Sequence, residues 1–273
     1  MSKMRERLDF GIDRPLIMAH RGDSQNTPEN TMLALESAAS IGVDVLESDV
    51  HLTIDDEVVL FHDETLERTT GKTGMIREFT LDELRNIDFG YTFTPDGGAT
   101  FPFRGKGHHI VTLQEAFERF PNTIFNLDIK DTFPSAPMEL ARLISQSDRS
   151  ESVIVASFHN VQIERFRELM PKIPTTAHPG EVKRFVLNTK FGLPRIRSED
   201  IHYKSFAVPM KSGPLKVITK KFVRKAHEHN IAVHVWTIND IVTMNSLIDL
   251  GVDGIFTDNP SLMREVLQAK GLL

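Results

Sequence analysis

With 273 residues, of which 40% are hydrophobic and 26% charged, the chain has the size and composition of one large globular domain with a sizeable core. A net charge of −6 and a pI of about 6.0 argue against nonspecific nucleic-acid binding, although a locally basic pocket could still hold a phosphate. The absence of cysteine excludes disulfides, thiolate metal sites and a cysteine nucleophile.

Neither Met1–Arg14 nor any later stretch has the apolar length of a signal peptide or of a membrane-spanning helix. We therefore expect a soluble, cytoplasmic protein without stable membrane insertion. Its oligomeric state stays open at the level of sequence.

The first predicted elements are a strand, a helix and a second strand. The apolar run Pro15–Ala19 predicts a buried strand that leads into a polar loop beginning at His20. Thr27-Pro28 predicts the start of a helix, because threonine caps and proline suits the first helical position, and Gly42 predicts its end. The run Val43–Leu46 then predicts the second strand.

The second strand is followed at once by two carboxylates. Residues two apart in a strand share a face, so Glu47 and Asp49 are expected side by side, with Ser48 pointing away. Two carboxylates on one face repel each other unless they share a proton or a cation, and paired hard oxygens are what Mg²⁺ or Ca²⁺ needs. The alternative is a solvated, inert strand end. A further apolar run, Val58–Phe61, predicts a hairpin-like extension that ends in His62.

Residues 64–107 break the alternation of elements. Thr80-Leu-Asp-Glu-Leu predicts a short helix, and the remainder is rich in Gly, Thr, Pro and Phe. A segment this long without clear elements is usually functional, as a lid or a small subdomain. Because it lacks a linker composition, we expect a single domain over residues 1–273 with a small insertion at about 64–107.

Helices and strands alternate after this segment to the end of the chain. The predicted strands are Thr123–Lys130, Ser152–Ser157, Ile173–Ala177, Ser205–Val208, Ile231–Trp236 and Asp253–Phe256. The predicted helices are Thr112–Phe120, Pro137–Gln146, Asn160–Met170, Val182–Thr189, Thr219–His229, Ile241–Asp249 and one from Ser261. Eight strand candidates, each followed by a helix or a helix-containing stretch, predict a (β/α)₈ TIM barrel rather than a doubly wound sheet.

Active sites of such barrels lie at the C-terminal ends of the strands. From the first strand to the eighth, these ends hold His20 and Arg21, Glu47 and Asp49 with His62 beyond the hairpin, Asp128 and Lys130, Ser157, Trp236 and Asp258. Ionisable groups from three consecutive strands are therefore expected at one mouth, an arrangement that scattered surface charge would not produce.

The carboxylates and histidines of this set suit hydrolysis of a phosphodiester. Glu47, Asp49 and Asp128 could hold one divalent cation and leave open positions for water or substrate. His20 and His62 could act as general base and general acid, because imidazole titrates near working pH.

The remaining candidates would contact the substrate. Arg21 as a planar fork and Lys130 as a point charge supply positive charge for a phosphate, although Lys130 could simply pair with its neighbouring aspartate. Trp236 is a third substrate-binding candidate, with barrel packing as its alternative. A histidine at a strand end could also be structural, and the other nine of the 11 histidines are expected on the surface or in loops.

An ordered set of short motifs runs from about Leu16 to the C-terminus. Its members are Ala19-His20-Arg21-Gly22, Pro28-Glu29-Asn30-Thr31, Glu47-Ser48-Asp49-Val50, Thr53-Ile54-Asp55, Phe61-His62-Asp63, Arg68-Thr69-Thr70-Gly71, Leu127-Asp128-Ile129-Lys130, Ser157-Phe158, Val235-Trp236-Thr237 and Thr257-Asp258-Asn259-Pro260. No single motif is decisive, but the ordered set resembles that of the glycerophosphodiester phosphodiesterase family.

The resemblance implies roles for the same residues. It makes His20 and His62 the acid–base pair, and it makes Glu47 and Asp49 metal ligands. Phosphate contacts fall to Arg21 and Lys130. The irregular segment 64–107 would be the family's insertion, which caps the mouth and helps to select the alcohol group.

One position departs from the family pattern. Asp128 stands where the family commonly has Glu as third metal ligand. Its carboxylate is one methylene shorter, so it would reach the ion through water or from a shifted loop. The choice between Mg²⁺ and Ca²⁺ is left open.

The implied reaction is metal-dependent hydrolysis of a glycerophosphodiester to sn-glycerol 3-phosphate and an alcohol. A first alternative is a phospholipase D-type enzyme, similar to lysophospholipase D or sphingomyelinase D, which acts on lipids with acyl chains. It needs an apolar ramp at the mouth, for which the insertion offers Phe79, Phe89, Tyr91, Phe93, Phe101 and Phe103, unless these form the insertion's own small core. A second alternative is a catalytically silent barrel that binds phosphorylated metabolites.

Overall fold

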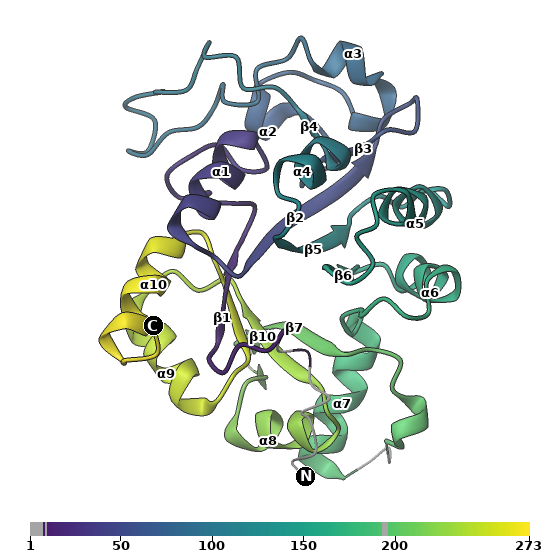
Figure 1. Ribbon diagram of the computed structural model, residues 1–273, viewed down its shortest axis with the longest axis vertical. Helices are drawn as coiled ribbons and strands as arrows, with labels where there is room; N and C mark the ends of the chain where they lie inside the picture. Colours follow the sequence, from purple (N-terminus) through teal and green to yellow (C-terminus); the bar gives the residue numbers. More distant parts are fainter. Residues whose placement is uncertain (1–7, 9, 193–195, 214) are drawn as a thin grey trace.

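The computed structural model describes residues 8, 10–192, 196–213 and 215–273, and Figure 1 labels its elements. Most of the stretch Met1–Arg14, which was examined above for a signal peptide, lies outside the described residues. Within the described ranges, no helix combines the length and the apolar character needed to cross a membrane.

A closed parallel sheet with helices around it forms the body of the molecule (Figure 1). In sheet order its strands are β7 (Ser205–Pro209), β10 (Ala232–Trp236), β11 (Gly254–Thr257), β1 (Leu16–Ala19), β2 (Val45–Leu52), β5 (Ile124–Ile129) and β6 (Val153–Ala156). Two parallel bridges, Val155–Thr175 and Thr176–Ser205, join β6 back to β7 and close the ring. The barrel predicted from the sequence is thus present.

The fifth position of the barrel is shorter than predicted. Instead of a strand over Ile173–Ala177, the structure has only the bridges at Thr175 and Thr176. Pro174 lacks an N–H group, so it can only accept, and its carbonyl takes the Val155 N–H at 3.0 Å. These few backbone hydrogen bonds are enough to connect β6 to β7.

The predicted helices of the barrel are confirmed to within a few residues, with one error at the first helix. They are α1 (Met32–Ile41), α4 (Leu113–Arg119), α5 (Ala136–Gln146), α6 (Asn160–Leu169), α7 (Pro179–Phe191), α8 (Lys220–Glu228), α9 (Ile241–Leu250) and α10 (Pro260–Ala269). Helix α1 begins after Thr31, not at Thr27-Pro28, because Asn30 has a φ of 57° and a left-handed residue interrupts a helix. The short η2 (Ser198–Asp200) and the hairpin of β8 (Lys211–Ser212) and β9 (Leu215–Lys216) were not predicted.

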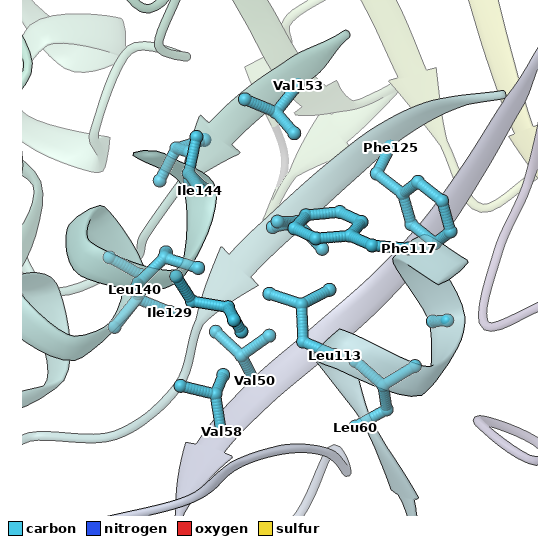
Figure 2. Close-up of a cluster of buried hydrophobic side chains, with 14 of the residues drawn as sticks. Val50, Val58, Leu60, Leu113, Phe117, Phe125, Ile129, Leu140, Ile144 and Val153 are labelled. Atoms are coloured by element: carbon cyan, nitrogen blue, oxygen red, sulfur yellow. The ribbon is translucent and has the colours of Figure 1, made fainter. Parts of the chain in front are cut away.

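Side chains alternate between the barrel interior and the helix-facing side, as the pleat of a strand requires. Leu16, Met18, Val45 and Phe256 form a buried cluster inside the barrel. The opposite faces of the strands pack on the helices, and Figure 2 shows one such layer. There, Val50, Phe125 and Ile129 of the sheet meet Phe117 of α4 and Leu140 of α5.

Two histidines expected at the surface are buried within strands instead. His51 of β2 is 7% exposed, and its Nε2 lies 3.2 Å from the His62 carbonyl oxygen. His234 of β10 is fully buried, and burial lowers its pKa to about 4. Gly254 makes room for it, since a Cβ there would lie 3.0 Å from the His234 ring and 2.9 Å from the Met18 sulfur. Both rings thus belong to the barrel, not to its surface.

The segment 64–107 lies at the top of the view in Figure 1 and carries short elements of its own. Between β3 (Val58–Leu60), which pairs antiparallel with β2, and β4 (Val111–Thr112), the chain forms α2 (Glu67–Thr70), η1 (Ile76–Glu78) and α3 (Leu81–Leu84). The short helix predicted from Thr80 is therefore confirmed, with the Thr80 side chain accepting from the Glu83 N–H.

Aromatic side chains of this segment contact several kinds of partner. Phe89 is buried in a small cluster with Phe61, Leu66, Ile76, Leu84 and Ile110, and Phe79 packs against it. Phe93 stacks edge-on against Phe103, and the Arg104 guanidinium lies over Tyr91 and Phe101. Phe79 and Phe89 thus belong to a small core of the segment, whereas Tyr91 is 42% exposed.

Candidate active site

A cavity of about 780 Å³ opens at the C-terminal ends of the strands. All eight residues predicted for the site line it, namely His20, Arg21, Glu47, Asp49, His62, Asp128, Lys130 and Trp236. The strand-end pattern of the sequence therefore predicted correctly that these side chains meet in one place.

Sheet register sets the acidic part of the cavity. β2 does not end at Leu46 but continues to Leu52, so Glu47 and Asp49 are strand residues that point into the barrel. The parallel pairing of β2 with β5 places Glu47 opposite Asn126, and Asp49 opposite Asp128. Asn126 was missed from the sequence, although it lies two residues before Asp128 and thus on the same face.

Two cations neutralise part of this acidic set. The Lys130 ammonium lies 2.7 Å from Asp128 Oδ2 and 3.3 Å from Asp49 Oδ1, and Arg21 Nε lies 3.2 Å from Asp49 Oδ2. Burial raises the pKa of Asp49, but Arg21 and Lys130 outweigh burial and hold that pKa below its usual value. Burial lowers the pKa of Lys130, and the two aspartates more than reverse this.

The charges of Glu47 and Asp128 are only partly compensated by the two cations. Glu47 accepts a hydrogen bond from the Arg21 N–H at 2.9 Å, yet burial and the neighbouring Asp49 raise its pKa to about 7. Burial also raises the pKa of Asp128, and its pairing with Lys130 offsets this only in part. A site in which carboxylates resist ionisation is one where an added cation would be stabilising.

The donor set fits a hard divalent cation by its chemistry, though not in its present arrangement. Over the described residues, no three His, Asp or Glu side chains stand close enough together to hold an ion. The buried oxygens Asp128 Oδ1 and Asn126 Oδ1 have no hydrogen-bond partner and belong to residues that line the cavity. Carboxylate and amide oxygens are the ligands that Mg²⁺ and Ca²⁺ prefer. Because the Lys130 ammonium bridges Asp49 and Asp128, ion binding there requires that it shift.

His20 is held by a carboxylate behind it. Its Nδ1 lies 2.6 Å from Asp258 Oδ1, and Asp258 also accepts hydrogen bonds from Ser24 and Asn239. Burial lowers the pKa of His20, but the Glu47 carboxylate and the hydrogen bond to Asp258 outweigh burial and raise it. With Nδ1 engaged, Nε2 is the ring nitrogen left for a substrate.

His62 is also held by a carboxylate, and this carboxylate belongs to a longer series of ion pairs. Its Nδ1 lies 2.6 Å from Asp63 Oδ1, and Arg68 Nε lies 2.5 Å from the other oxygen of Asp63. Arg68 also bonds Glu29 at 2.7 and 2.8 Å, and Glu29 accepts from Arg21 at 2.9 Å. We call this series, from His62 through Asp63, Arg68 and Glu29 to Arg21, the ion-pair chain.

Asp258 and Asp63, which lie against the two histidines, were given no role from the sequence, although Asp258 was placed at the mouth with the other strand ends. The sequence did hold a signal for both. Asp63 directly follows His62, and Asp258 stands at the end of the eighth strand, next to the first strand of a closed barrel.

The loop after β1 is shaped by two left-handed residues. Arg21 has a φ of 57°, which is uncommon for a side chain of this size, and Gly22 has a φ of 84°. A Cβ on Gly22 would lie 2.5 Å from the Ala34 carbonyl carbon of α1, so only glycine lets the loop pass there. This tight turn is what directs the Arg21 N–H toward Glu47.

Trp236 and Phe158 form an aromatic part of the cavity lining. Their ring centroids are 5.8 Å apart in an edge-on arrangement, and the Lys130 ammonium lies 5.1 Å from the Phe158 ring centroid. Trp236 also packs against the buried cluster inside the barrel. Trp236 thus packs in the barrel and also lines the cavity, and its role in substrate binding stays a prediction.

A barrel with two carboxylate-oriented histidines, an acidic cluster and two cations at its mouth has the groups that a phosphoric diester hydrolase requires. Residues 20–262 match the model of the glycerophosphoryl diester phosphodiesterase family, and the chain belongs to that family.

Individual relatives agree with this assignment. A glycerophosphodiester phosphodiesterase of Bacillus subtilis is 31% identical over 268 residues, which cover 93% of this chain and 87% of that one. A human lysophospholipase D is 30% identical over 277 residues, which cover 92% and 85%.

Solved structures share the fold at lower identity. The glycerophosphoryl diester phosphodiesterase domain of a Mycobacterium tuberculosis protein matches with a TM-score of 0.81 at 19% identity, over 94% of this chain and 100% of that one. An Oleispira antarctica phosphodiesterase, solved in complex with the product sn-glycerol-3-phosphate, matches with a TM-score of 0.76 at 23% identity, over 93% and 97%.

Proposed function

We propose that this phosphoric diester hydrolase converts a glycerophosphodiester and water to sn-glycerol 3-phosphate and an alcohol, using a divalent cation and His20 and His62 as acid–base pair. The observation that carries the proposal is the matched support of the two histidines. Each has its Nδ1 at 2.6 Å from an aspartate and lines the same cavity as Arg21 and Lys130.

In the proposed reaction the histidines divide the proton transfers. One removes a proton from the nucleophile, and the other protonates the leaving alkoxide, with Asp258 and Asp63 keeping the rings in place. Arg21 and Lys130 attract the phosphate. Relief of their close pairing with Asp49 and Asp128 would free both cations for the substrate.

The cation would be held by Glu47, Asp49 and Asp128, with the Asn126 amide oxygen as a fourth donor. When bound, it would stabilise the charge that develops on the phosphoryl oxygens. The orphaned Asp128 and Asn126 oxygens and the raised pKa of Glu47 support this choice. Donor chemistry admits either Mg²⁺ or Ca²⁺.

We also propose that residues 1–273 form one domain in which 64–107 is the family insertion. The ion-pair chain supports this, since Arg68 of α2 reaches both Asp63 and Glu29 across the mouth. The segment would then act on catalysis through His62 rather than through aromatic contacts with the alcohol.

The test is release of sn-glycerol 3-phosphate from glycerophosphocholine after treatment with EDTA and after return of Mg²⁺ or Ca²⁺. We expect no product in EDTA and product with at least one of the two ions. Saturable binding of glycerophosphocholine without product under every ion condition would contradict the proposal and favour the silent barrel.

The phospholipase D-type alternative uses the same groups on a substrate with an acyl chain. It gains support from the human lysophospholipase D that this chain resembles over most of its length. The aromatics of the 64–107 segment do not supply the apolar ramp that it needs, because none of the six lines the cavity. Any chain-binding surface must therefore lie elsewhere in the cavity.

A further inference from the structure

The Asp258 carboxylate has a second partner besides His20 that the sequence did not single out. Asn239 lies in the connection between β10 and α9, and its amide nitrogen donates to Asp258 Oδ2 at 2.6 Å. The other carboxylate oxygen, Asp258 Oδ1, lies 2.6 Å from His20 Nδ1. One carboxylate thus joins the asparagine amide to the imidazole that is proposed to transfer a proton.

The orientation of the Asn239 amide follows from its other contacts. Its oxygen accepts from the Asp258 backbone N–H at 2.9 Å and from the Thr257 hydroxyl at 3.0 Å. A backbone N–H can only donate, so the amide atom that faces it must be the oxygen, and the NH₂ group must face the carboxylate. A single side chain therefore holds both the backbone and the carboxylate of Asp258.

The backbone around Asn239 is fixed on both sides. Ile238 is buried, and its N–H donates to the Phe256 carbonyl oxygen of β11 at 2.9 Å. Asp240 caps α9, and its side chain accepts from the Thr243 N–H at 2.8 Å. A strand contact on one side and a helix cap on the other give the Asn239 amide a defined place, which a positioning group needs.

Asp258 depends on such a partner because it is not enclosed. Its side chain is 30% exposed and lines a separate polar pocket of about 260 Å³, where water can compete for its oxygens. Ser24 also donates to Asp258 Oδ1, at 3.0 Å, but it shares its one hydroxyl proton with the His20 carbonyl oxygen at 2.7 Å. Burial raises the pKa of Asp258, and its hydrogen bonds to His20 and Asn239 outweigh burial and lower that pKa. The carboxylate is thus ionised and accepts from both neighbours.

We infer that Asn239 is a positioning residue, which acts through Asp258 to hold the His20 ring in the orientation that proton transfer requires. This inference rests on the proposed function, since it is there that His20 transfers a proton. Asn239 does not line the cavity proposed to hold the substrate, so its loss should lower kcat and leave KM nearly unchanged. A misplacement of about 1 Å can cost about 10²-fold in rate, which gives the upper end of the expected effect.

Two substitutions separate this role from a purely structural one. Asn239→Ala removes all three hydrogen bonds, whereas Asn239→Asp can still accept from the Asp258 N–H and the Thr257 hydroxyl but cannot donate to the carboxylate. With glycerophosphocholine, we expect kcat to fall about 10- to 100-fold in both variants and KM to change less than about twofold. The control is Asn245→Ala, which removes an amide of α9 that donates to the Ile241 carbonyl oxygen. Near wild-type kcat in Asn239→Asp would show a structural role and overturn the inference.

Combination with Asp258→Ala tests whether the effect passes through the carboxylate. In that background, Asn239→Ala should lower kcat no further, because the group on which it acts is gone. An undiminished loss in the double variant would show that Asn239 acts by another route and would also overturn the inference.

A measurement without substrate tests the same contact. In a long-range ¹H–¹⁵N NMR spectrum, the ring signals of His20 and His62 are assigned by their loss in the respective alanine variants. We expect Asn239→Asp to shift or broaden the His20 signals and to leave those of His62 in place. Unchanged His20 signals would overturn the inference. Absence of product from the wild type under every ion condition would instead contradict the proposed function, and the spectrum would still show whether Asn239 positions the ring.

Discussion

The two sides of the cavity differ in the kind of side chain that lines them. On the side built by β1, β2 and β5, charged groups are buried, and nearly every one is tied to another through ion pairs and hydrogen bonds. On the side built by β7 and α7, aliphatic groups line the space and need no such partners. Burying charge is costly unless it is paired, whereas burying an aliphatic side chain is favourable.

We therefore expect the charged side to govern turnover and the aliphatic side to govern which substrate fits. A substitution on the charged side disturbs a network, so its effect spreads to neighbouring groups and to turnover. A substitution on the aliphatic side changes shape alone, so it should alter which substrate fits. The predictions below test where that boundary lies.

The largest effect is expected on the charged side. Replacing His20 or His62 by Ala removes a group proposed to transfer a proton, so kcat for glycerophosphocholine should fall by about 10²- to 10⁴-fold. The control is His159→Ala, because His159 is an exposed histidine just after β6. Near wild-type turnover in either of the first two variants would show that the acid–base assignment is wrong.

A stability effect is expected on the side of β7 and β10. Both ring nitrogens of the buried His234 lack hydrogen-bond partners, and its pKa of about 4 lies below the ordinary 6.5. The unfolded chain therefore takes up the proton first, so stability is complete above pH 6.5 and falls as the pH drops toward 4, by roughly 3 kcal/mol.

The variant His234→Leu should remove this loss. Its melting temperature would then decline less than that of the wild type between pH 7 and pH 4.5, as measured by calorimetry. His159→Leu is the control and should follow the wild type. Identical pH dependence of His234→Leu and wild type would mean that this ring takes up no proton on unfolding.

An intermediate effect is expected at Asp128. If its unpartnered oxygen helps to hold the cation, Asp128→Asn should raise the concentration of Mg²⁺ or Ca²⁺ needed for half-maximal activity by about 10- to 100-fold. Asp128→Glu keeps a carboxylate at this position, so the concentration should stay near or below that of the wild type. A cation dependence unchanged in both variants would remove Asp128 from the set of ligands.

The smallest effect is expected from the ion-pair chain. Arg68→Gln breaks the link between Asp63 and Glu29, so His62 would be held less firmly and kcat should fall about tenfold or less, with KM little changed. Stability should shift by about 1 kcal/mol, because the Arg68 side chain is 48% exposed although Glu29 and Asp63 are largely covered. Arg85→Gln is the control, because Arg85 is as exposed as Arg68 and its pair with Glu115 lies away from the histidines. Equal activity of both variants would show that Arg68 has no positioning role.

Much of this molecule could be read from its sequence because local patterns and strand ends were informative. Apolar runs and helical spacing located most elements of the barrel. Since parallel strands end at one mouth, residues such as His20, Asp49 and Lys130 could be brought together without coordinates.

What was missed depends on contacts distant in sequence. Helix α1 starts late because Asn30 bonds Ser48 and Asp49, and no local pattern reveals that pairing. His234 is buried because a glycine on the next strand leaves room for it. The aliphatic part of the cavity lining was not predicted, because its residues come from separate elements and resemble any core residue in sequence.

The bridged fifth position of the barrel has a dynamic consequence. Only a few backbone bonds at Thr175, Thr176 and Ala177 join β6 to β7, so amide protons there should exchange with solvent more readily than those of β2 or β5. Two of these residues, Thr176 and Ala177, also line the cavity. Local opening of this seam would widen the cavity on its aliphatic side without disturbing the charged groups of β1, β2 and β5.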